Sequence, residues 1–495
     1  MSKIIIQNGN MCELDLPLKF AQKLYNEFAI RHPNAFYLRT RQRGMQNWDG
    51  KIHYITKTGQ FKIGLLPKVY DMCIEMGIKP KVVDMRQPLP KVSKVVTNIG
   101  KYKLRPEQEK AVKAVINNKI GNTPFHIGVL DYTVNAGKTL IMSSLYLSYK
   151  KQLKTLLITN DSDWLNQARE EFKQYLPGED ITFVQGKVLN WSNFTIGMVQ
   201  SISRNMRFYQ KELSQIDMVL IDEADQGGSK QYQNVITQLF NTRIRIGLSG
   251  TIYMSKLAKD RVKNMNLECF FGKVLAEFKL KDSIKKGYST KTVVKMVPGK
   301  PWYGNWESDC ISYKEIYDDS ITNCYTAWLM AYNRLLWNLN QGRYPALVVC
   351  KHIAHCENLY KFFKKKLGDA YNIAYVHVNT PSKLRQQIMK DFREGKIDIL
   401  VSTTIIARGK NFPKLRYLLN AASMDSQEKS IQFLGRLVRT DKSKKKVYLD
   451  DLHYPGNYLD RHGKHRKQYY QRQELKVILL DKLWKKHPNH SLIKS

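Results

Sequence analysis

From about Gly100 onward, short apolar runs alternate with longer stretches in which apolar residues recur every three or four positions. Short runs rich in β-branched residues are typical of buried strands, and the wider spacing is typical of amphipathic helices. The predicted strands are Phe125–Leu130, Thr155–Thr159, Met218–Ile221, Arg245–Leu248, Ala346–Cys350, Ala374–Val378 and Ile397–Val401. Buried strands separated by helices indicate parallel sheets covered on both faces, and these units are too many for one sheet.

This rhythm divides the chain into four predicted parts. The alternation is interrupted over Lys279–Asn323 by Gly, Pro and mixed charges, so we place the connection between two α/β domains at its start. Residues 1–98 lack the alternation and predict a separate small α+β module. The four predicted domains are therefore 1–98, 99–278, 279–452 and 453–495, of which the last is a basic extension containing Tyr469, Tyr470 and Trp484.

Charge narrows the range of partners. The 495 residues include 81 Lys and Arg against 43 Asp and Glu, a formal net charge of +38, while a hydrophobic content of 43% supports packed cores. A cationic excess spread over the whole length favours a polyanionic partner, because binding to phosphates releases counterions. Charge alone says nothing about sequence specificity.

Cysteine usage and the N-terminus predict an intracellular protein. The seven cysteines are scattered without a C-x-x-C pair, which is typical of reduced thiols in the cytoplasm. The N-terminal apolar run is too short for a secretory signal, and no apolar stretch approaches the roughly 18 residues that a membrane span needs. We therefore expect a soluble cytoplasmic protein without membrane contact.

The segment Val129–Leu140, VLDYTVNAGKTL, follows an apolar strand and opens a helical pattern. Backbone N–H groups at such a loop, here over Asn135, Ala136 and Gly137, bind phosphate oxygens. Lys138 can neutralise the β- and γ-phosphates, and the Thr139 hydroxyl can bind Mg²⁺. The usual pattern has a glycine where this chain has Tyr132, and an isolated GKT also arises by chance.

An acidic cluster supplies the second motif. The apolar run before Asp222-Glu223-Ala224-Asp225 predicts two carboxylates at the carboxyl end of a strand, where α/β sheets bind ligands. Asp222 would hold Mg²⁺ and Glu223 would deprotonate an attacking water. A solvated acidic loop is the alternative, and it is less plausible in so basic a chain that also carries a GKT.

The third motif places Gln432, Arg436 and Arg439 at i, i+4 and i+7, which predicts one face of a helix. Two guanidinium groups and an amide on one face suit the charge that develops on a γ-phosphate. A basic helix face without such a role is the alternative, and the two preceding motifs argue against it.

Together these motifs resemble helicase superfamily 2 over about residues 100–452. Leu104–Gln108 resembles the adenine-reading Q element, with Arg105 and Gln108 as nucleotide contacts. Leu248–Thr251 resembles the element that couples hydrolysis to domain motion. Thr403–Asn411 resembles the fifth motif, with Gly409 and Asn411 as nucleotide contacts, although many relatives have Asp in place of Asn411. The resemblance implies two tandem RecA-like domains that close on ATP and Mg²⁺, with a small α+β N-terminal domain and a basic C-terminal extension.

Within the superfamily the chain resembles the UvsW branched-DNA helicases of tailed bacteriophages. The segments that carry this resemblance are Asn47–Ile52, Gly64–Leu66, Val134–Thr139 and Lys351–His355. The resemblance implies an ATP-driven motor that remodels forks, junctions and R-loops and moves 3′ to 5′. Its partners would be branched DNA, bound without sequence preference, and RNA–DNA hybrids. We expect a monomeric motor, acting in the host cytoplasm if the source is viral.

Two other functions stay open. The DEAD tetrapeptide favours an RNA helicase of the DEAD-box type, but Ser249-Gly250-Thr251 differs from that family's SAT and Thr159–Gln167 lacks its P-T-x-E-L. A non-catalytic protein that only anneals strands would share the charge, but it would have no reason to keep Lys138, Glu223 and Arg439 together.

Three local patterns have competing interpretations. Cys350–Cys356 offers four soft ligands, but no second ligand pair is visible, so we do not favour zinc. Trp48 is equally compatible with base stacking and with anchoring a tight hairpin. The KSKKK run, Lys442–Lys446, predicts a solvated turn rather than a localisation signal.

Overall fold

The computed structural model describes residues 2–41, 45–149, 152–186, 190–253, 260–299, 312–407, 412–425 and 427–480. The chain forms two compact units, Met1–Phe278 (unit 1) and Lys279–Ser495 (unit 2), and each is described by itself. No helix of the described residues is long and apolar enough to cross a membrane.

Unit 1 is built on a seven-stranded sheet in which every strand is parallel to its neighbours. In spatial order the strands are β13 (Ile181–Val184), β14 (Phe194–Met198), β12 (Thr155–Thr159), β15 (Met218–Asp222), β16 (Ile244–Ser249), β11 (His126–Tyr132) and β17 (Val274–Phe278). The four strands predicted for this part are β11, β12, β15 and β16, each buried along its whole length. The predicted parallel sheet is confirmed.

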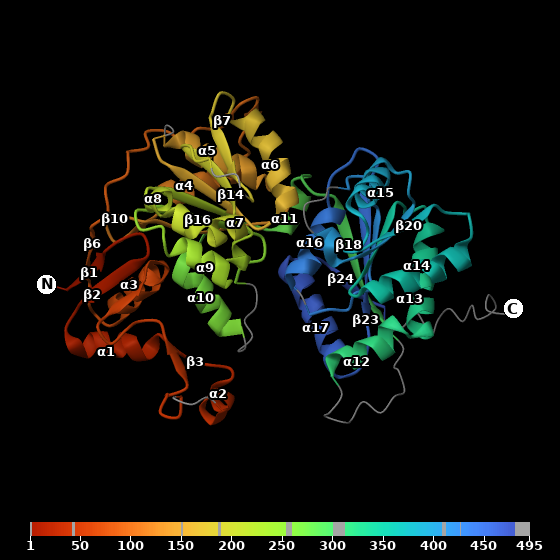
Figure 1. The fold of residues 1–495 in the computed structure, drawn as a ribbon, viewed down its shortest axis with the longest axis horizontal. Helices are drawn as coiled ribbons and strands as arrows, with labels where there is room; N and C mark the ends of the chain where they lie inside the picture. Colours follow the sequence, from red (N-terminus) through yellow and green to blue (C-terminus); the bar gives the residue numbers. More distant parts are fainter. Residues whose placement is uncertain are drawn as a thin grey trace. The chain divides into compact units, whose positions relative to one another are not determined.

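Helices cover both faces of this sheet (Figure 1). One face carries α4 (Pro106–Ile116), α5 (Lys138–Ser148) and α6 (Ser162–Tyr175), and the other carries α7 (Val199–Arg204), α9 (Lys230–Ile236) and α10 (Arg261–Phe271). Smaller elements are α8 (Gln210–Ser214), the ladder of β7 (Asn98–Ile99) with β8 (Tyr102–Lys103), and that of β9 (Lys119–Ile120) with β10 (Thr123–Pro124). The arrangement leaves the strand ends, rather than the sheet faces, open to a ligand.

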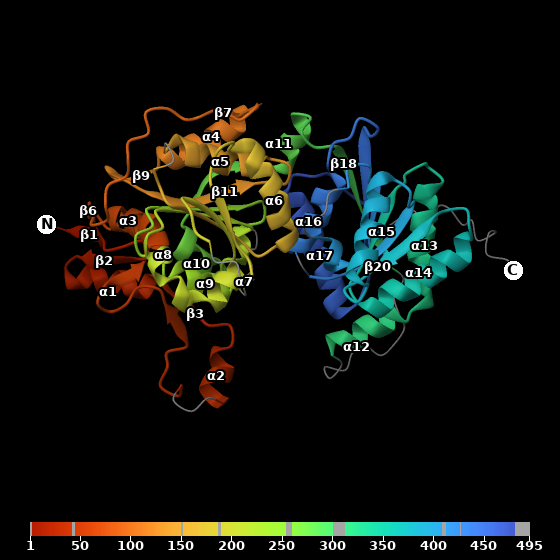
Figure 2. The same ribbon diagram turned by 45° about the horizontal axis from the view of Figure 1, so that its top comes forward.

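The N-terminal segment adds a second, mixed sheet to unit 1. Its order is β5 (Gln60–Lys62), β2 (Met11–Asp15), β1 (Lys3–Ile6) and β6 (Lys81–Asp84), with α1 (Leu18–Glu27) and α3 (Leu66–Glu75). Between these elements, residues 29–41 and 45–53 form an arm of β3 (Ala29–Arg31), α2 (Ala35–Arg41) and β4 (Lys51–His53). Figures 1 and 2 show β3 and α2 projecting from the body of unit 1. The expected α+β character is confirmed.

A buried arginine joins this N-terminal sheet to the large sheet. Arg245 on β16 is fully buried; its guanidinium donates to the carbonyl oxygens of Gly9 at 2.6 Å and Phe270 at 3.1 Å, and to Asn10 Oδ1 at 2.7 Å. Burial lowers the pKa of Arg245 to about 9. The two terminal nitrogens of the guanidinium thus make three hydrogen bonds, which offset part of the cost of burying the cation and fix one sheet against the other.

Close backbone packing strengthens the same junction. Gly64 lies against α10, where a Cβ would overlap the carbonyl oxygen of Glu268. Tyr54 donates to Asn266 Oδ1 at 2.9 Å, and one hydrophobic cluster runs from Ile4 to Phe271. The boundary predicted at residue 98 therefore falls within one compact unit, and the N-terminal module shares its core with the first α/β domain.

Unit 2 contains a second all-parallel sheet of seven strands. Its order is β20 (Ile373–Val376), β21 (Ile399–Thr403), β19 (Ala346–Cys350), β22 (Tyr417–Asn420), β23 (Lys446–His453), β18 (Lys291–Pro298) and β24 (Val477–Leu479). On one face lie α13 (Tyr325–Leu339) and α14 (Ile353–Leu367); on the other lie α15 (Ser382–Glu394), α16 (Gln427–Leu437) and α17 (Asn457–Arg472). The short α11 (Leu280–Lys285) and α12 (Tyr313–Tyr317) complete the unit. Two tandem RecA-like sheets are thus confirmed.

Four strands of unit 2 are not among the predicted strands, namely β18, β22, β23 and β24. β18 belongs to the segment predicted as a break in the rhythm, and β24 belongs to the predicted C-terminal extension. A buried ion pair explains how the extension is held: the Arg466 guanidinium donates to Asp451 at 2.9 Å, and the Tyr470 hydroxyl donates to the same carboxylate at 2.7 Å. The part of the extension up to Leu479 is therefore integral to the sheet.

We predict that Arg245→Met destabilises the N-terminal sheet more than the large sheet of unit 1. The substitution keeps volume but leaves three buried oxygen acceptors without their donor, which should cost about 3 kcal/mol or more. Hydrogen exchange of the full-length protein should accelerate in β1 and β2 and change little in β12. The exposed Arg204 offers a control, Arg204→Met, and equal exchange in both variants would contradict the assignment.

Candidate functional site

The loop between β11 and α5 adopts the shape that a phosphate site requires. Asn135 and Gly137 both have left-handed backbone conformations, with φ of 64° and 73°. Gly137 can have no side chain because a Cβ there would overlap Nε2 of Gln108. The turn leads directly into the N-terminus of α5 at Lys138, so the free N–H groups of the first helical turn border the loop.

The predicted Q element holds this loop from the side. Gln108 is fully buried and donates from Nε2 to the carbonyl oxygen of Ala136 at 2.8 Å, while its Oε1 accepts from the Arg105 amide at 2.8 Å. Arg105 Nη2 donates to the carbonyl oxygen of Asn135 at 3.1 Å. Both side chains thus position the phosphate loop, a role that sequence reasoning did not foresee. Adenine reading by Gln108 stays a prediction.

The acidic cluster follows β15 at the same edge of the sheet. Asp222 is buried, and its Oδ1 lies 3.5 Å from Lys138 Nζ. Burial raises the pKa of Asp222, while Lys138 acts in the opposite direction. Glu223 has a left-handed backbone with φ of 53° and ψ of 51°, which is costly for a residue with a side chain. Such strain is concentrated at functional positions.

The residues present fit a magnesium ion beside a bound phosphate. Asp222 Oδ1 is buried and, beyond the long 3.5 Å contact with Lys138 Nζ, makes no hydrogen bond within the described part of the chain. Mg²⁺ is usually bound through one or two side-chain oxygens together with substrate phosphates. Asp222 and the half-buried Thr139 at the start of α5 are such donors.

The Ser249-Gly250-Thr251 segment connects the acidic cluster to the phosphate loop. Ser249 Oγ donates to Asp225 Oδ1 at 2.7 Å. Gly250 faces the start of the loop, where a Cβ would lie 3.0 Å from Thr133 Cα and 3.1 Å from the Tyr132 carbonyl oxygen. Tyr132 stands where the usual phosphate-loop pattern has Gly, and Gly250 stands where the DEAD-box motif has Ala. These two unusual positions lie against each other.

The third motif, in unit 2, is only partly helical. Gln432 and Arg436 lie on α16, but this helix ends at Leu437, so the prediction that Arg439 continues the same helical face is wrong. The cause is Thr290, which precedes β18. Its amide donates to the Val438 carbonyl at 2.8 Å and its hydroxyl to that of Arg439 at 3.1 Å. These bonds replace the helical ones and turn the chain.

Other predicted nucleotide contacts have different outcomes. Gly409 and Asn411 lie outside the described residues.

In the discounted zinc cluster, Cys350 and Cys356 are buried, and His355 Nδ1 lies 3.3 Å from the Tyr317 hydroxyl. Burial lowers the pKa of His355 to about 3, so this imidazole is neutral at physiological pH.

One lysine of the KSKKK run is buried, which corrects the prediction of a fully solvated turn. Lys444 is only 7% exposed and donates from Nζ to the carbonyl oxygens of Leu415 at 3.0 Å and Leu437 at 3.1 Å. Leu437 is the last residue of α16, so this cation caps the helix before Arg439. A lysine run carries no signal of which member is buried.

Trp48 behaves as a hairpin anchor. Its Nε1–H donates to the Lys51 carbonyl at 2.8 Å, and its ring makes an edge contact with His32. Of the two interpretations left open by the sequence, these contacts support the structural one.

Two regions of the chain match known protein families. The family described as "Type III restriction enzyme, res subunit" matches residues 101–254, and "Helicase conserved C-terminal domain" matches residues 329–441. The putative helicase 22 of a Sulfolobus islandicus filamentous virus is 23% identical, with 71% of this chain and 64% of that protein covered. The ATP-dependent DNA helicase uvsW of Enterobacteria phage T4 is 21% identical, with 88% and 90% covered.

Solved structures share the fold. An ATP-dependent Type ISP restriction-modification enzyme bound to DNA superposes with a TM-score of 0.58 at 13% identity, covering 83% of this chain and 34% of that enzyme. This chain covers 64% of the length of the Sulfolobus virus relative and 90% of the length of the phage T4 relative.

We predict that Lys138→Ala and Glu223→Gln each abolish ATP turnover, for different reasons. The first removes the positive charge beside Asp222 that would balance the phosphates, so nucleotide affinity should also fall. The second keeps the shape of the side chain and removes only the base, so nucleotide should still bind. Phosphate release and nucleotide titration of both variants separate these effects; near-normal turnover in either would refute the assignment.

We predict a pH-dependent stability from Lys444. Burial, together with the nearby Arg416 and Arg439 and against the attraction of Asp441, lowers the pKa of Lys444 to about 8. Between this value and about 10.5, its ordinary pKa, the unfolded chain binds a proton that the folded chain does not. Stability should therefore rise with pH across this window, by up to about 3 kcal/mol.

Thermal unfolding of Lys444→Met measured between pH 7.5 and 10 should lack this rise, relative to the wild-type protein. Lys445 is exposed, so Lys445→Met is the matched control and should follow the wild type. Parallel pH profiles for all three proteins would show that Lys444 is not the titrating group.

Proposed function

We propose that this chain, which belongs to helicase superfamily 2, uses ATP hydrolysis to remodel branched DNA. Its two matched motor domains make it an ATP-dependent helicase, as the sequence motifs predict, and nucleotide is its cofactor. The resemblance to the phage UvsW helicases is confirmed by the T4 relative, which matches over most of both chains. The choice of branched DNA is the part that we propose.

The nucleotide would bind at the strand ends of unit 1. The backbone over Asn135, Ala136 and Gly137 would hold the phosphates, with Lys138 balancing their charge. Thr139 and Asp222 would hold Mg²⁺, which supplies further charge neutralisation when bound. Glu223 would take the proton of the attacking water, since its strained backbone fixes the carboxylate one residue beyond Asp222.

Unit 2 would complete the site only when the two domains close. Gln432 and Arg436 on α16, and Arg439 after it, would contact the γ-phosphate. Because Arg439 follows the helix, its position would depend on the Thr290 contacts and on Lys444 rather than on helical geometry alone. Hydrolysis would then be linked to opening and closing of the pair.

DNA is the partner that charge and relatives favour. The formal net charge is +38, the T4 relative is named a DNA helicase, and a structure of similar fold is bound to DNA. Contacts to phosphates would make binding independent of sequence. We propose forks, junctions and RNA–DNA hybrids as substrates, and a monomeric cytoplasmic motor, which acts in the host cytoplasm if the source is viral.

The observation that carries the choice of branched DNA is the N-terminal arm. The described residues of the arm, 29–41 and 45–53, project from unit 1 and contain Arg31, Arg39, Arg41 and Lys51 against one acidic residue, Asp49. Because the N-terminal sheet is locked to the motor domain through Arg245, force from the motor would reach whatever the arm holds. Gripping the duplex beside a junction turns translocation into branch migration.

The test is a panel of substrates matched in length: fork, four-way junction, linear duplex, RNA duplex and hybrid. We predict fastest ATP-driven strand exchange on the fork and junction. Deleting residues 1–98 would expose the shared core, so the arm is tested by Arg41→Gln with Lys51→Gln. Losing two phosphate contacts should lower the log–log salt slope of fork binding by about 1.8.

Lys19→Gln with Lys23→Gln on the neighbouring α1 is the matched control, because these lysines are exposed and lie outside the arm. Equal rates on linear duplex and branched DNA would refute the proposed substrate. An unchanged salt slope in the arm variant would refute its role in holding DNA.

A further inference from the structure

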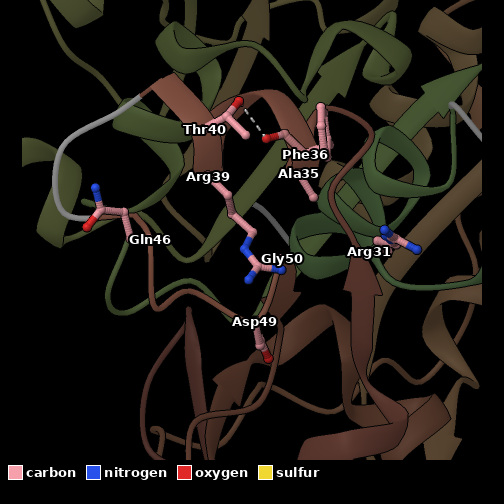
Figure 3. A pocket seen from close by; sticks show the side chains of 8 residues that line it. All are labelled: Arg31, Ala35, Phe36, Arg39, Thr40, Gln46, Asp49 and Gly50. Atoms are coloured by element: carbon pink, nitrogen blue, oxygen red, sulfur yellow. Dashed lines mark hydrogen bonds between the residues drawn. The ribbon is translucent and has the colours of Figure 1, made fainter.

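The arm forms one side of an open cavity of about 400 Å³ that the motor mechanism does not use. Its lining includes Arg31 from β3, Phe36 and Arg39 from α2, and Gln46 and Asp49 from the loop before β4 (Figure 3). The volume lies in the roughly 300–1,000 Å³ range of pockets that hold small ligands. A nucleotide is of suitable size.

Aromatic rings stand exposed beside this cavity. Phe36 is 81% exposed and the adjacent Tyr37 is 54% exposed, although both belong to a helix. The Arg41 guanidinium lies 4.5 Å from the centre of the Tyr37 ring and donates to the Tyr37 hydroxyl at 2.8 Å. A solvent-exposed Phe that lines a pocket together with arginines is typical of a stacking platform for bases.

The charge of the cavity favours an anion. In the described part of the chain neither Arg31 nor Arg39 forms an ion pair, and Figure 3 shows Arg39 extending from α2 toward Gly50. The acid of the lining is already engaged: Asp49 Oδ1 accepts from the Lys51 amide at 2.9 Å, and Asp49 Oδ2 contacts His53 Nε2 at 2.7 Å. The arginines are therefore the groups left to meet a phosphate.

We propose that this cavity binds one unpaired nucleotide of a strand displaced at a branch point. Arg31 and Arg39 hold its phosphate, and its base stacks on Phe36. A paired base presents only its edges, so an exposed ring can stack on a base only after the base leaves the duplex. The inference rests on the proposed function, because a branch point supplies unpaired nucleotides next to duplex.

The experiment uses the full-length protein and a fork whose first unpaired base is 2-aminopurine, which loses fluorescence when it stacks on an aromatic ring. Wild-type protein should quench the probe and Phe36→Trp should preserve quenching. Phe36→Ala should abolish it and weaken fork binding about 5- to 150-fold, the loss of one base–aromatic stack. Binding of blunt duplex should not change in Phe36→Ala.

Matched variants identify which contact acts. Phe208, in a 3-10 helix (Met206–Phe208), is 77% exposed and lies outside the arm, so Phe208→Ala should quench like the wild type. Arg39→Gln should weaken fork binding and reduce its salt dependence by about one phosphate contact. Wild-type quenching by Phe36→Ala, or equal weakening on fork and blunt duplex, would overturn the proposal and leave an arm that contacts duplex only.

The outcome is separable from the choice of branched DNA. If the wild-type protein shows no preference for forks in strand exchange, but binding of an oligo(dT) strand still depends on Phe36, the nucleotide cavity stands and the proposed function fails. If forks are processed and Phe36 is irrelevant to quenching and affinity, the cavity proposal alone fails.

Discussion

The parallel direction of the strands is the constraint on which the nucleotide site depends. Because β11, β15 and β16 are neighbours that run the same way, their carboxyl ends reach one edge of the sheet. The phosphate loop, the acidic cluster and the Ser-Gly-Thr segment follow these ends directly, although they are far apart in sequence. Lys138 and Asp222 meet at 3.5 Å for this reason. An antiparallel neighbour would separate them by the length of a strand.

Three loops can meet at one edge of the sheet only if neighbouring segments pack closely, and glycines occupy the points of closest approach. A side chain at Gly137 would overlap Gln108, and one at Gly250 would crowd Thr133. The fully buried Gln108 then bonds the carbonyl of Ala136 in the space that Gly137 leaves. A chain with Tyr132 at the usual first glycine position can still form the loop, because Asn135 and Gly137 supply the left-handed turns.

The sequence predicted central strands well because they are uninterrupted apolar runs, as in Thr155–Thr159 and Ala346–Cys350. It missed β18, whose lysines interrupt the pattern, and β24, a three-residue edge strand. Candidate residues at strand ends were predictable from local motifs. The end of α16 before Arg439 was not, because it is set by Thr290, about 150 residues away in the sequence, and no local pattern reports such a partner.

Arg245 is an exception to the rule that buried strands consist of apolar residues, because its side chain joins two sheets. A cation within a buried strand is costly, and an apolar residue would give a simpler sheet. Here its donors reach Gly9 and Asn10 of another sheet, and Gly64 allows α10 to approach the same module. Two sheets joined through hydrogen bonds from a buried guanidinium move as one body, since separating them would leave the charge without these acceptors. The proposed role of the N-terminal module in holding DNA would require this rigidity, since a flexible linker would not transmit force from the first α/β domain.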